Sequence, residues 1–157
     1  MSAHPPYRPN VCMLVFNSRG ELFLGQREGE PETWQFPQGG VDAGQSLEEN
    51  VLRELQEELG AAKECFAVVA QLKATHTYDF STPRAYGAEV FRGQAQTFWL
   101  VRFVADDSAI QIATPEREFM GWGWYTPAAV RRKAEPRRLS GYLGPLAEFE
   151  CYWAGRK

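Results

Sequence analysis

Residues 46–60 have the pattern of an amphipathic helix with both ends marked. Ser46 followed three residues later by Glu49 is a capping-box pattern, in which side chains satisfy the free backbone N–H groups of a helix start. Apolar residues then recur at helical spacing, at Leu47, Val51, Leu52, Leu55 and Leu59. Gly60 stands where a helix C-cap is expected. The sequence therefore predicts a helix over residues 46–59.

Three glutamates crowd one face of this helix. Glu54, Glu57 and Glu58 stand at positions i, i+3 and i+4, so their carboxylates lie within about one turn of each other. For a helix taken alone, the simplest interpretation is a solvated acidic face. The same oxygen donors also suit Mg²⁺ or Mn²⁺, which take one or a few carboxylates and complete their shell with water and substrate phosphates.

The rest of the chain has the pattern of many strands with a few helices. Strands are predicted over residues 11–16, 22–24, 34–36, 66–72, 74–80, 96–104 and 119–125, with a turn over 37–40. Helices are predicted over 127–133 and 139–153. With 157 residues, 44% of them hydrophobic, the chain has the composition of an ordinary globular protein. We expect a single α+β domain over residues 1–157.

Charge and composition argue against several classes of protein. Seventeen Lys and Arg against 20 Asp and Glu give a formal charge of −3, so the bulk balance attracts neither nucleic acid nor an anionic membrane. The apolar runs fall far short of the ~20 residues of a membrane helix, and the first residues lack a secretory pattern. We expect a cytoplasmic protein. Cys12, Cys65 and Cys151 form no Cys-x-x-Cys pair, which favours free thiols.

The predicted helix is part of a longer pattern. Gly39 is followed by five residues and Gln45, then by seven residues and the run R-E-L-Q-E-E-L-G over 53–60. This resembles the signature of the Nudix hydrolases, G-x5-E-x7-R-E-U-x-E-E-x-G-U, where U is aliphatic. Gln45 stands at the first glutamate of the signature, and Ala61 at its last aliphatic position. The resemblance implies an α/β/α sandwich, a mixed β-sheet between helices, in which the signature forms a loop-helix-loop metal site.

Four further blocks extend the resemblance over most of the chain. They are Y-R-P-N-V at 7–11, W-Q-F-P-Q-G-G at 34–40, G-Q-A-Q at 93–96 and E-F-M-G-W at 118–122. They resemble the branch that contains bacterial RNA 5′-pyrophosphohydrolases and dinucleoside polyphosphate hydrolases. Tyr78, seventeen residues beyond Ala61, has the spacing of a tyrosine marker of the dinucleoside polyphosphate hydrolases.

The resemblance implies a site that holds Mg²⁺ or Mn²⁺ for phosphoanhydride hydrolysis, which needs charge neutralisation, an aligned water and a base. The implied metal-binding residues are Gly39, through its main-chain carbonyl, and Glu54, Glu57, Glu58 and Glu118. Glu57 or Glu58 would alternatively act on the attacking water. Arg53 would orient a neighbouring carboxylate.

The implied substrate-binding residues are polar or basic side chains of the same blocks and of the basic run 131–138. They are Arg8, Arg27, Gln38, Tyr78, Gln94, Gln96 and Arg137. Arginine suits this role because its guanidinium group forks onto phosphates and stacks on bases. The basic run fits either a grip on an RNA backbone or a solvated helix face.

Our first hypothesis from the sequence is an Mg²⁺-dependent hydrolase that removes pyrophosphate from 5′-triphosphorylated RNA and initiates mRNA decay. The alternatives are a dinucleoside polyphosphate hydrolase acting on molecules such as diadenosine tetraphosphate, and a nucleoside triphosphate pyrophosphohydrolase. A nucleotide- or RNA-binding module with an inactive site is a fourth alternative, supported by Gln45 alone. No membrane partner is expected, and a homodimer is left open.

Overall fold

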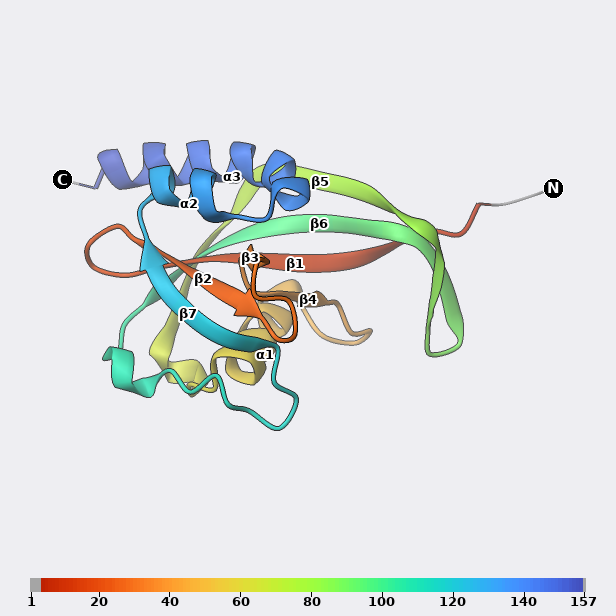
Figure 1. The fold of residues 1–157 in the computed structure, drawn as a ribbon, viewed down its shortest axis with the longest axis horizontal. Helices are drawn as coiled ribbons and strands as arrows, with labels where there is room; N and C mark the ends of the chain where they lie inside the picture. Colours follow the sequence, from red (N-terminus) through yellow and green to blue (C-terminus); the bar gives the residue numbers. More distant parts are fainter. Residues whose placement is uncertain (1–3, 157) are drawn as a thin grey trace.

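The computed structural model describes residues 4–156 and, within them, one mixed β-sheet with helices on both faces. The elements in chain order are β1 (Tyr7–Phe16), β2 (Leu22–Arg27), β3 (Trp34–Gln35), β4 (Gln38–Gly40), α1 (Leu47–Leu59), η1 (Lys63–Cys65), β5 (Phe66–Tyr86), β6 (Glu89–Phe103), η2 (Asp107–Ala109), β7 (Phe119–Tyr125), α2 (Pro127–Lys133) and α3 (Pro136–Ala154). Helices α2 and α3 cover one face of the sheet, and α1 lies on the other (Figure 1). The expected arrangement of a mixed sheet between helices is confirmed.

The central strand β1 changes partner along one of its edges. On the other edge it runs parallel to β6 over its whole length. On the changing edge it pairs with β2 only at Phe16 and Leu22, whereas β4 pairs antiparallel with it around Val11. Strand β2 continues beside β7 and β3. Residues 38–40 were expected to form a turn. They instead form the short strand β4, which pairs with the part of β1 that β2 does not reach.

Strand β1 supports two hydrophobic cores because successive side chains of a strand point to opposite faces. Its odd-numbered residues from Val11 to Val15 pack in the core beneath α1, and its even-numbered residues from Cys12 to Phe16 pack in the core beneath α2 and α3. All of these residues are fully or almost fully buried. A continuous apolar run is what a strand covered on both faces requires.

The predicted helix is α1, and its capping box is present. The Ser46 hydroxyl accepts from the Glu49 backbone N–H at 3.1 Å, and the Glu49 carboxylate accepts from the Ser46 N–H at 2.8 Å. Gly60 ends the helix in a left-handed conformation with φ 66°. These local contacts fix the start and end of the helix that carries the acidic residues.

The two strands predicted over 66–72 and 74–80 are a single long strand, β5. The expected break is a register shift, where the backbone N–H groups of Lys73 and Ala74 both donate to the Glu148 carboxylate of α3 at 2.7 Å. A turn at Gly87, with φ 64°, joins β5 to β6. The tip of this β5–β6 hairpin projects beyond the rest of the sheet (Figure 1).

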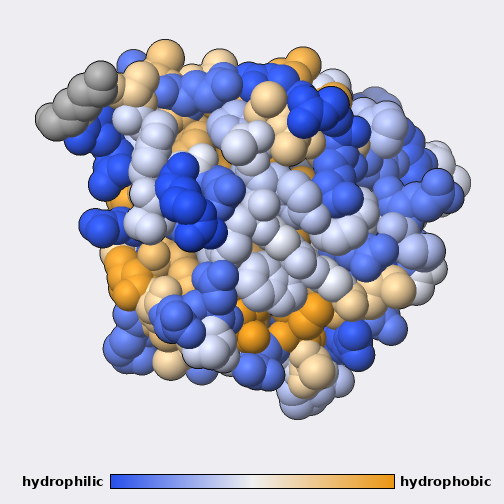
Figure 2. Space-filling model, turned by 60° about the vertical axis from the view of Figure 1, so that its left-hand side comes forward, coloured by the Kyte–Doolittle hydropathy of each residue, from blue (hydrophilic) through white to orange (hydrophobic). Residues whose placement is uncertain are grey.

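Helix α3 begins at Pro136, before the predicted start at residue 139, because the Glu135 carboxylate caps it by accepting from the Arg138 N–H at 2.9 Å. All three cysteines are free thiols, as expected. Among residues 4–156, no helix is both long and apolar enough to cross a membrane. Figure 2 shows the face at the C-terminal end of α3 as mostly hydrophilic, with hydrophobic residues in small separate groups.

Candidate active site

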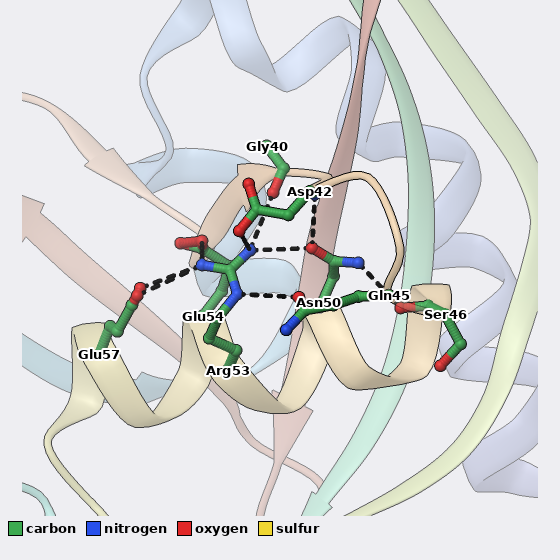
Figure 3. A network of polar contacts seen from close by, with 8 residues as sticks. All are labelled: Gly40, Asp42, Gln45, Ser46, Asn50, Arg53, Glu54 and Glu57. Atoms are coloured by element: carbon green, nitrogen blue, oxygen red, sulfur yellow. Dashed lines mark hydrogen bonds and ion pairs between the residues drawn. The ribbon is translucent and has the colours of Figure 1, made fainter.

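Arg53 is the centre of a polar network on α1 (Figure 3). Its Nη1 contacts the Glu54 carboxylate at 2.9 Å and the Glu57 carboxylate at 3.1 Å. Its Nε donates to the Gln45 amide oxygen at 3.2 Å. The neutral amide of Gln45 thus still accepts a hydrogen bond from Arg53, although it lacks the charge of the glutamate in the Nudix signature. Arg53 thus contacts two of the predicted metal-binding carboxylates, those of Glu54 and Glu57.

Asn50 supports this network from inside the protein and was missed by sequence reasoning. Its amide oxygen accepts from Arg53 Nη2 and from the Asp42 backbone N–H, both at 2.8 Å. Its amide nitrogen donates to the Ser46 carbonyl at 2.8 Å. The side chain is fully buried, and in the sequence it is only one polar residue among others on a helix. Asn50 ties the loop before α1 to the helix itself.

Glu58 is the buried member of the acidic group. It is 4% exposed, whereas the Glu57 side chain is 49% exposed. Burial raises the pKa of Glu58 well above its usual value, and the nearby charges of Glu54 and Glu118 raise it further, against a backbone hydrogen bond from Gln38. Within residues 4–156, its Oε2 atom has no hydrogen-bond partner. A buried carboxylate oxygen without a partner calls for an explanation, and a cation is one.

Gly39 and Gly40 of β4 bring backbone close to charged side chains on opposite sides of the strand. A Cβ atom added to Gly39 would overlap the Glu54 carboxyl group, and one added to Gly40 would overlap the Arg8 guanidinium. Only glycine leaves room for both side chains at this distance. The Gly39 carbonyl therefore belongs to the same neighbourhood as the acidic side chains of α1.

Several predicted metal-binding residues come together, and the donors fit Mg²⁺ or Mn²⁺. Glu118, just before β7, lies close enough to Glu58 for its charge to raise the Glu58 pKa. Burial also raises the pKa of Glu54, which Arg53 opposes and Glu57 reinforces. Within residues 4–156, no three or more Asp, Glu, His or Cys side chains are placed closely enough to hold a metal ion together. The unpartnered Glu58 oxygen, with the Glu54 carboxyl group packed against Gly39, suits a cation that takes few carboxylates and completes its shell with water and phosphate.

A row of amide side chains connects this site to the sheet. Gln96 Nε2 donates to Gln38 Oε1 at 2.7 Å and to Asn10 Oδ1 at 3.0 Å. Asn10 Nδ2 donates to Gln94 Oε1 at 3.0 Å, and Gln94 Nε2 donates to the Tyr78 hydroxyl oxygen at 2.6 Å. Four of the predicted substrate-binding residues are thus joined in one network. Sequence reasoning missed Asn10 as its centre, although the Y-R-P-N-V block contained it.

A pocket of about 560 Å³, which we call the sheet pocket, opens beside this network. Gln38, Tyr78, Gln96 and Arg137 line it, as expected for substrate-binding residues. Arg138 lines it as well and was not assigned from the sequence. A second hollow, of about 920 Å³, lies between α1 and residues 111–116 on the side of Arg53 and Glu57. Glu57 of the acidic cluster lines this second hollow, whereas Gln38 of β4 is the residue of the Nudix region that lines the sheet pocket.

The two other predicted substrate-binding arginines, Arg27 and Arg8, do not line the sheet pocket. Arg27 forms an ion pair with Glu30 at 2.9 Å, at the end of β2. Arg8 lies beside Gly40, with its guanidinium carbon 4.1 Å from the centre of the Tyr86 ring.

The basic run 131–138 is less basic in the fold than in the sequence. Arg131 pairs with Glu150 at 2.7 Å, and Lys133 Nζ lies 4.1 Å from the centre of the Trp34 ring. Arg137 is 91% exposed and pairs with Glu135 at 2.7 Å. Arg137 and Arg138 are the members of the run that reach the sheet pocket.

Comparison of the structure with solved structures supports the fold assignment. The MutT protein from Methanosarcina mazei has a TM-score of 0.68 at 19% identity, with 99% of this chain and 100% of that chain covered. An Ap4A hydrolase from C. elegans, in a binary complex, has a TM-score of 0.66 at 21% identity, with 93% and 98% covered. At these identities the likeness is one of fold.

Comparison of the sequence gives closer relatives. A protein of Roseobacter denitrificans named RNA pyrophosphohydrolase is 38% identical over 96% of both chains. Proteins of the same name from Cereibacter sphaeroides and Caulobacter vibrioides are 40% and 39% identical, covering 95% and 97% of this chain and 94% and 91% of their own. The family model described as NUDIX domain matches residues 6–142. The chain therefore belongs to the NUDIX family, as its residues 39–60 predict.

Proposed function

We propose that this protein is a Nudix hydrolase that removes pyrophosphate from the 5′-triphosphate end of RNA in an Mg²⁺- or Mn²⁺-dependent reaction, and so initiates mRNA decay in the cytoplasm. One observation carries the proposal. The side chain of Gln38 lines the sheet pocket, and its backbone lies close enough to the buried Glu58 carboxyl to oppose the rise in the pKa of that group. A nucleotide in this pocket lies beside β4, the short strand whose other side packs against the acidic cluster. Relatives named RNA pyrophosphohydrolase, at 34–40% identity, support RNA as the substrate.

The proposed metal-binding groups are the Glu54, Glu58 and Glu118 carboxylates and the Gly39 carbonyl. Glu57 joins them when its ion pair with Arg53 is broken. A divalent cation bound there supplies neutralisation of the phosphate charge and a water of lowered pKa. Glu57, half-exposed and oriented by Arg53, is the proposed acceptor of the proton from the attacking water, with Glu58 as the alternative.

The substrate-binding residues are proposed to act at increasing distance from the reacting phosphates. Gln38, Gln94, Gln96 and Tyr78 hold the nucleoside, because their network presents fixed donors and acceptors at the sheet pocket. Arg137 meets phosphate groups from the rim of this pocket. Arg8 and Arg27 are proposed for phosphates or bases that extend beyond it.

A dinucleoside polyphosphate hydrolase is the second candidate. The observation in its favour is that Tyr78, the residue with the marker spacing, lines the sheet pocket and is held there by Gln94. Its ring offers a face to a base and its hydroxyl group a polar contact. A nucleoside triphosphate would use the same metal site, but it carries no second nucleoside or RNA chain on the far side of its phosphates.

A competition assay tests the proposal. The enzyme is given Mg²⁺ with a short 5′-triphosphate RNA, diadenosine tetraphosphate and free GTP together, and the products are identified by mass. We expect pyrophosphate to be released mainly from the RNA, activity to stop in chelator, and activity to return with Mg²⁺ or Mn²⁺. Preference for either other substrate would overturn the RNA assignment, and absence of metal-dependent turnover on all three would favour the inactive binding module.

A further inference from the structure

A line of aromatic rings leads from the sheet pocket to the tip of the β5–β6 hairpin. Neighbouring ring centres are 5.9 Å apart for His76 and Tyr78, 6.1 Å for Tyr78 and Phe80, 6.2 Å for Phe80 and Tyr86, and 5.9 Å for Tyr86 and Phe91. The first three rings line the pocket itself. The last two flank the Gly87 turn. The rings therefore form a continuous path away from the proposed reaction site.

Phe91 is buried at 8% exposure, and the other four rings of the row lie only partly buried in the described protein. Within residues 4–156, none of them belongs to either hydrophobic cluster of the sheet. Tyr78, Phe80 and Tyr86 keep part of their surface exposed, and the hairpin tip projects beyond the body of the sheet (Figure 1). Large aromatic residues usually contribute most through burial in a core. A half-exposed row of them needs another use.

Two arginines lie over this row. The guanidinium carbon of Arg84 is 4.3 Å from the centre of the Phe80 ring, and that of Arg8 is 4.1 Å from the centre of the Tyr86 ring. In the part of the chain that the structure describes, neither arginine has a carboxylate partner, whereas Arg92 on the same hairpin is paired with Asp79 at 3.1 Å. Positive charge without a carboxylate partner is thus held directly over two partly exposed rings.

Ring faces interleaved with cations are the two components of a surface for single-stranded nucleic acid. Bases stack on the rings whatever their identity, because every base has a π face, and cationic side chains meet the phosphates. The row follows an extended strand, β5, across its register shift between Asp79 and Arg84. An extended polynucleotide therefore has successive contacts along it.

We propose that this surface, which we call the hairpin platform (Tyr78, Phe80, Arg84, Tyr86 and Arg8), binds the nucleotides that follow the 5′-terminal one in single-stranded RNA. The identity of the polymer rests on the proposed function, since RNA is the one candidate substrate that continues as a chain beyond the pocket. Bases stack on Phe80 and Tyr86, and Arg84 and Arg8 contact the backbone phosphates. The platform therefore makes affinity depend on the length of the RNA more than on its base sequence.

The kinetic test compares kcat/KM for 5′-triphosphate RNAs of two and of eight nucleotides. For the unaltered enzyme we expect the octamer to exceed the dimer by at least about tenfold, the order expected from one base–ring stack. Phe80→Ala and Tyr86→Ala should bring this ratio close to one, and Tyr86→Phe should restore it. Val90→Ala, at a 48% exposed position of the same hairpin, is the matched control and should keep the ratio.

A binding test separates the platform from catalysis. Fluorescence anisotropy with a labelled 5′-hydroxyl octanucleotide measures affinity for a chain that has no bond to hydrolyse. We expect Phe80→Ala to weaken binding about tenfold, and Arg84→Gln to lower the slope of log affinity against log salt by about 0.7. Equal affinity of both variants and the unaltered protein would overturn the platform, as would equal kcat/KM for the two RNA lengths. Release of no pyrophosphate from either RNA would instead overturn the proposed function, and the binding result would still decide the platform.

Discussion

Gly39 and Glu54 are packed so closely that the glycine has no room for even a methyl group on the side of the carboxylate. The contact joins the short strand β4 to helix α1, two segments that carry different halves of the Nudix signature. It gives the site its shape, because it fixes where the Gly39 carbonyl and the Glu54 carboxylate stand relative to each other.

Replacing the two glycines of β4 should separate chemistry from binding. Gly39→Ala pushes against the Glu54 carboxyl, so we expect kcat to fall at least about tenfold and stability to fall by about 1–3 kcal/mol. Gly40→Ala pushes against the flexible end of Arg8, so it should mainly raise KM. Gly155→Ala, where a Cβ would make ordinary contacts, is the control. Steady-state kinetics and chemical denaturation measure these effects, and an unchanged kcat in Gly39→Ala would contradict the site.

Glu58→Gln should inactivate the enzyme while keeping or raising its thermal stability. The variant removes a charge that is 4% exposed and lies near Glu54 and Glu118, and its amide oxygen still accepts a hydrogen bond. We expect turnover to fall by about a hundredfold or more. Glu57→Gln should lose a similar share of turnover but change stability by only ~0.3–0.5 kcal/mol, since it breaks an exposed helix pair. Unchanged turnover in both variants would refute the assignment of the acidic residues.

Gln45→Glu, which restores the glutamate of the Nudix signature, should have little effect. The Gln45 amide already accepts from Arg53, and Arg53 already contacts the carboxylates of Asp42, Glu54 and Glu57. An exposed ion pair adds about 0–1 kcal/mol, so we expect stability to rise by no more than that and turnover to change less than about threefold. Parallel measurements of turnover and of the denaturation midpoint decide this. A tenfold gain in turnover would mean that the amide limits the enzyme.

Asn10→Leu should damage both stability and substrate binding. It leaves the Gln94 oxygen without its donor and removes one of the two acceptors of Gln96. Leaving a buried polar group unsatisfied costs about 1–3 kcal/mol. We expect a loss in that range and a raised KM, because Tyr78 is held through Gln94. Asn10→Asp keeps the acceptor for Gln96 and should lie between the two proteins; a KM equal to that of the unaltered enzyme in both variants would rule out a role for this network in binding.

Glu135 makes the stability of the protein depend on acid pH. Burial opposes ionisation, but hydrogen bonds from Arg137 and from the Arg138 backbone lower the pKa of this carboxyl below its usual value. A lowered pKa stabilises the fold above the unfolded pKa of about 4.3, and this contribution is lost as the pH falls through the folded pKa. Glu135→Gln should therefore be less stable by about 1 kcal/mol at pH 7, and this difference should shrink as the pH falls toward about 3.

Thermal unfolding at pH 7 and at about pH 3 tests this prediction. Glu150→Gln, which breaks the exposed ion pair between Arg131 and Glu150, is measured for comparison. A difference that persists at the acid pH would mean that the charge of Glu135 is not what stabilises the start of α3.

Elements whose signals are local were predicted well from the sequence. The capping box and Gly60 decide the ends of α1 within the helix itself, and the alternating aromatic residues of 119–125 match β7. Strand β4 was missed because Q-G-G has the composition of a turn, and its strand character comes from pairing with β1, a distant segment. The continuity of β5 was missed for the same reason, since Glu148 of α3 holds its backbone at the shift.

The sequence predicted which residues make up the site better than it predicted their burial and their contacts. The spacing of Glu54, Glu57 and Glu58 identified the acidic cluster, but only tertiary packing makes Glu58 buried and leaves Glu57 with Arg53. Asn10 and Asn50 were missed because a buried amide carries no mark in the sequence that separates it from an exposed one.

Strand β4 is only three residues long, and two of them are glycines, so a single thickness of backbone separates the Arg8 guanidinium from the Glu54 carboxylate. The residues that we propose for recognition and those that we propose for hydrolysis therefore lie on opposite sides of one short strand. Mutations along the β5–β6 hairpin are free to change which molecules are accepted while the acidic machinery stays as it is. A fold divided in this way gives evolution a means to diversify substrates around an unchanging reaction.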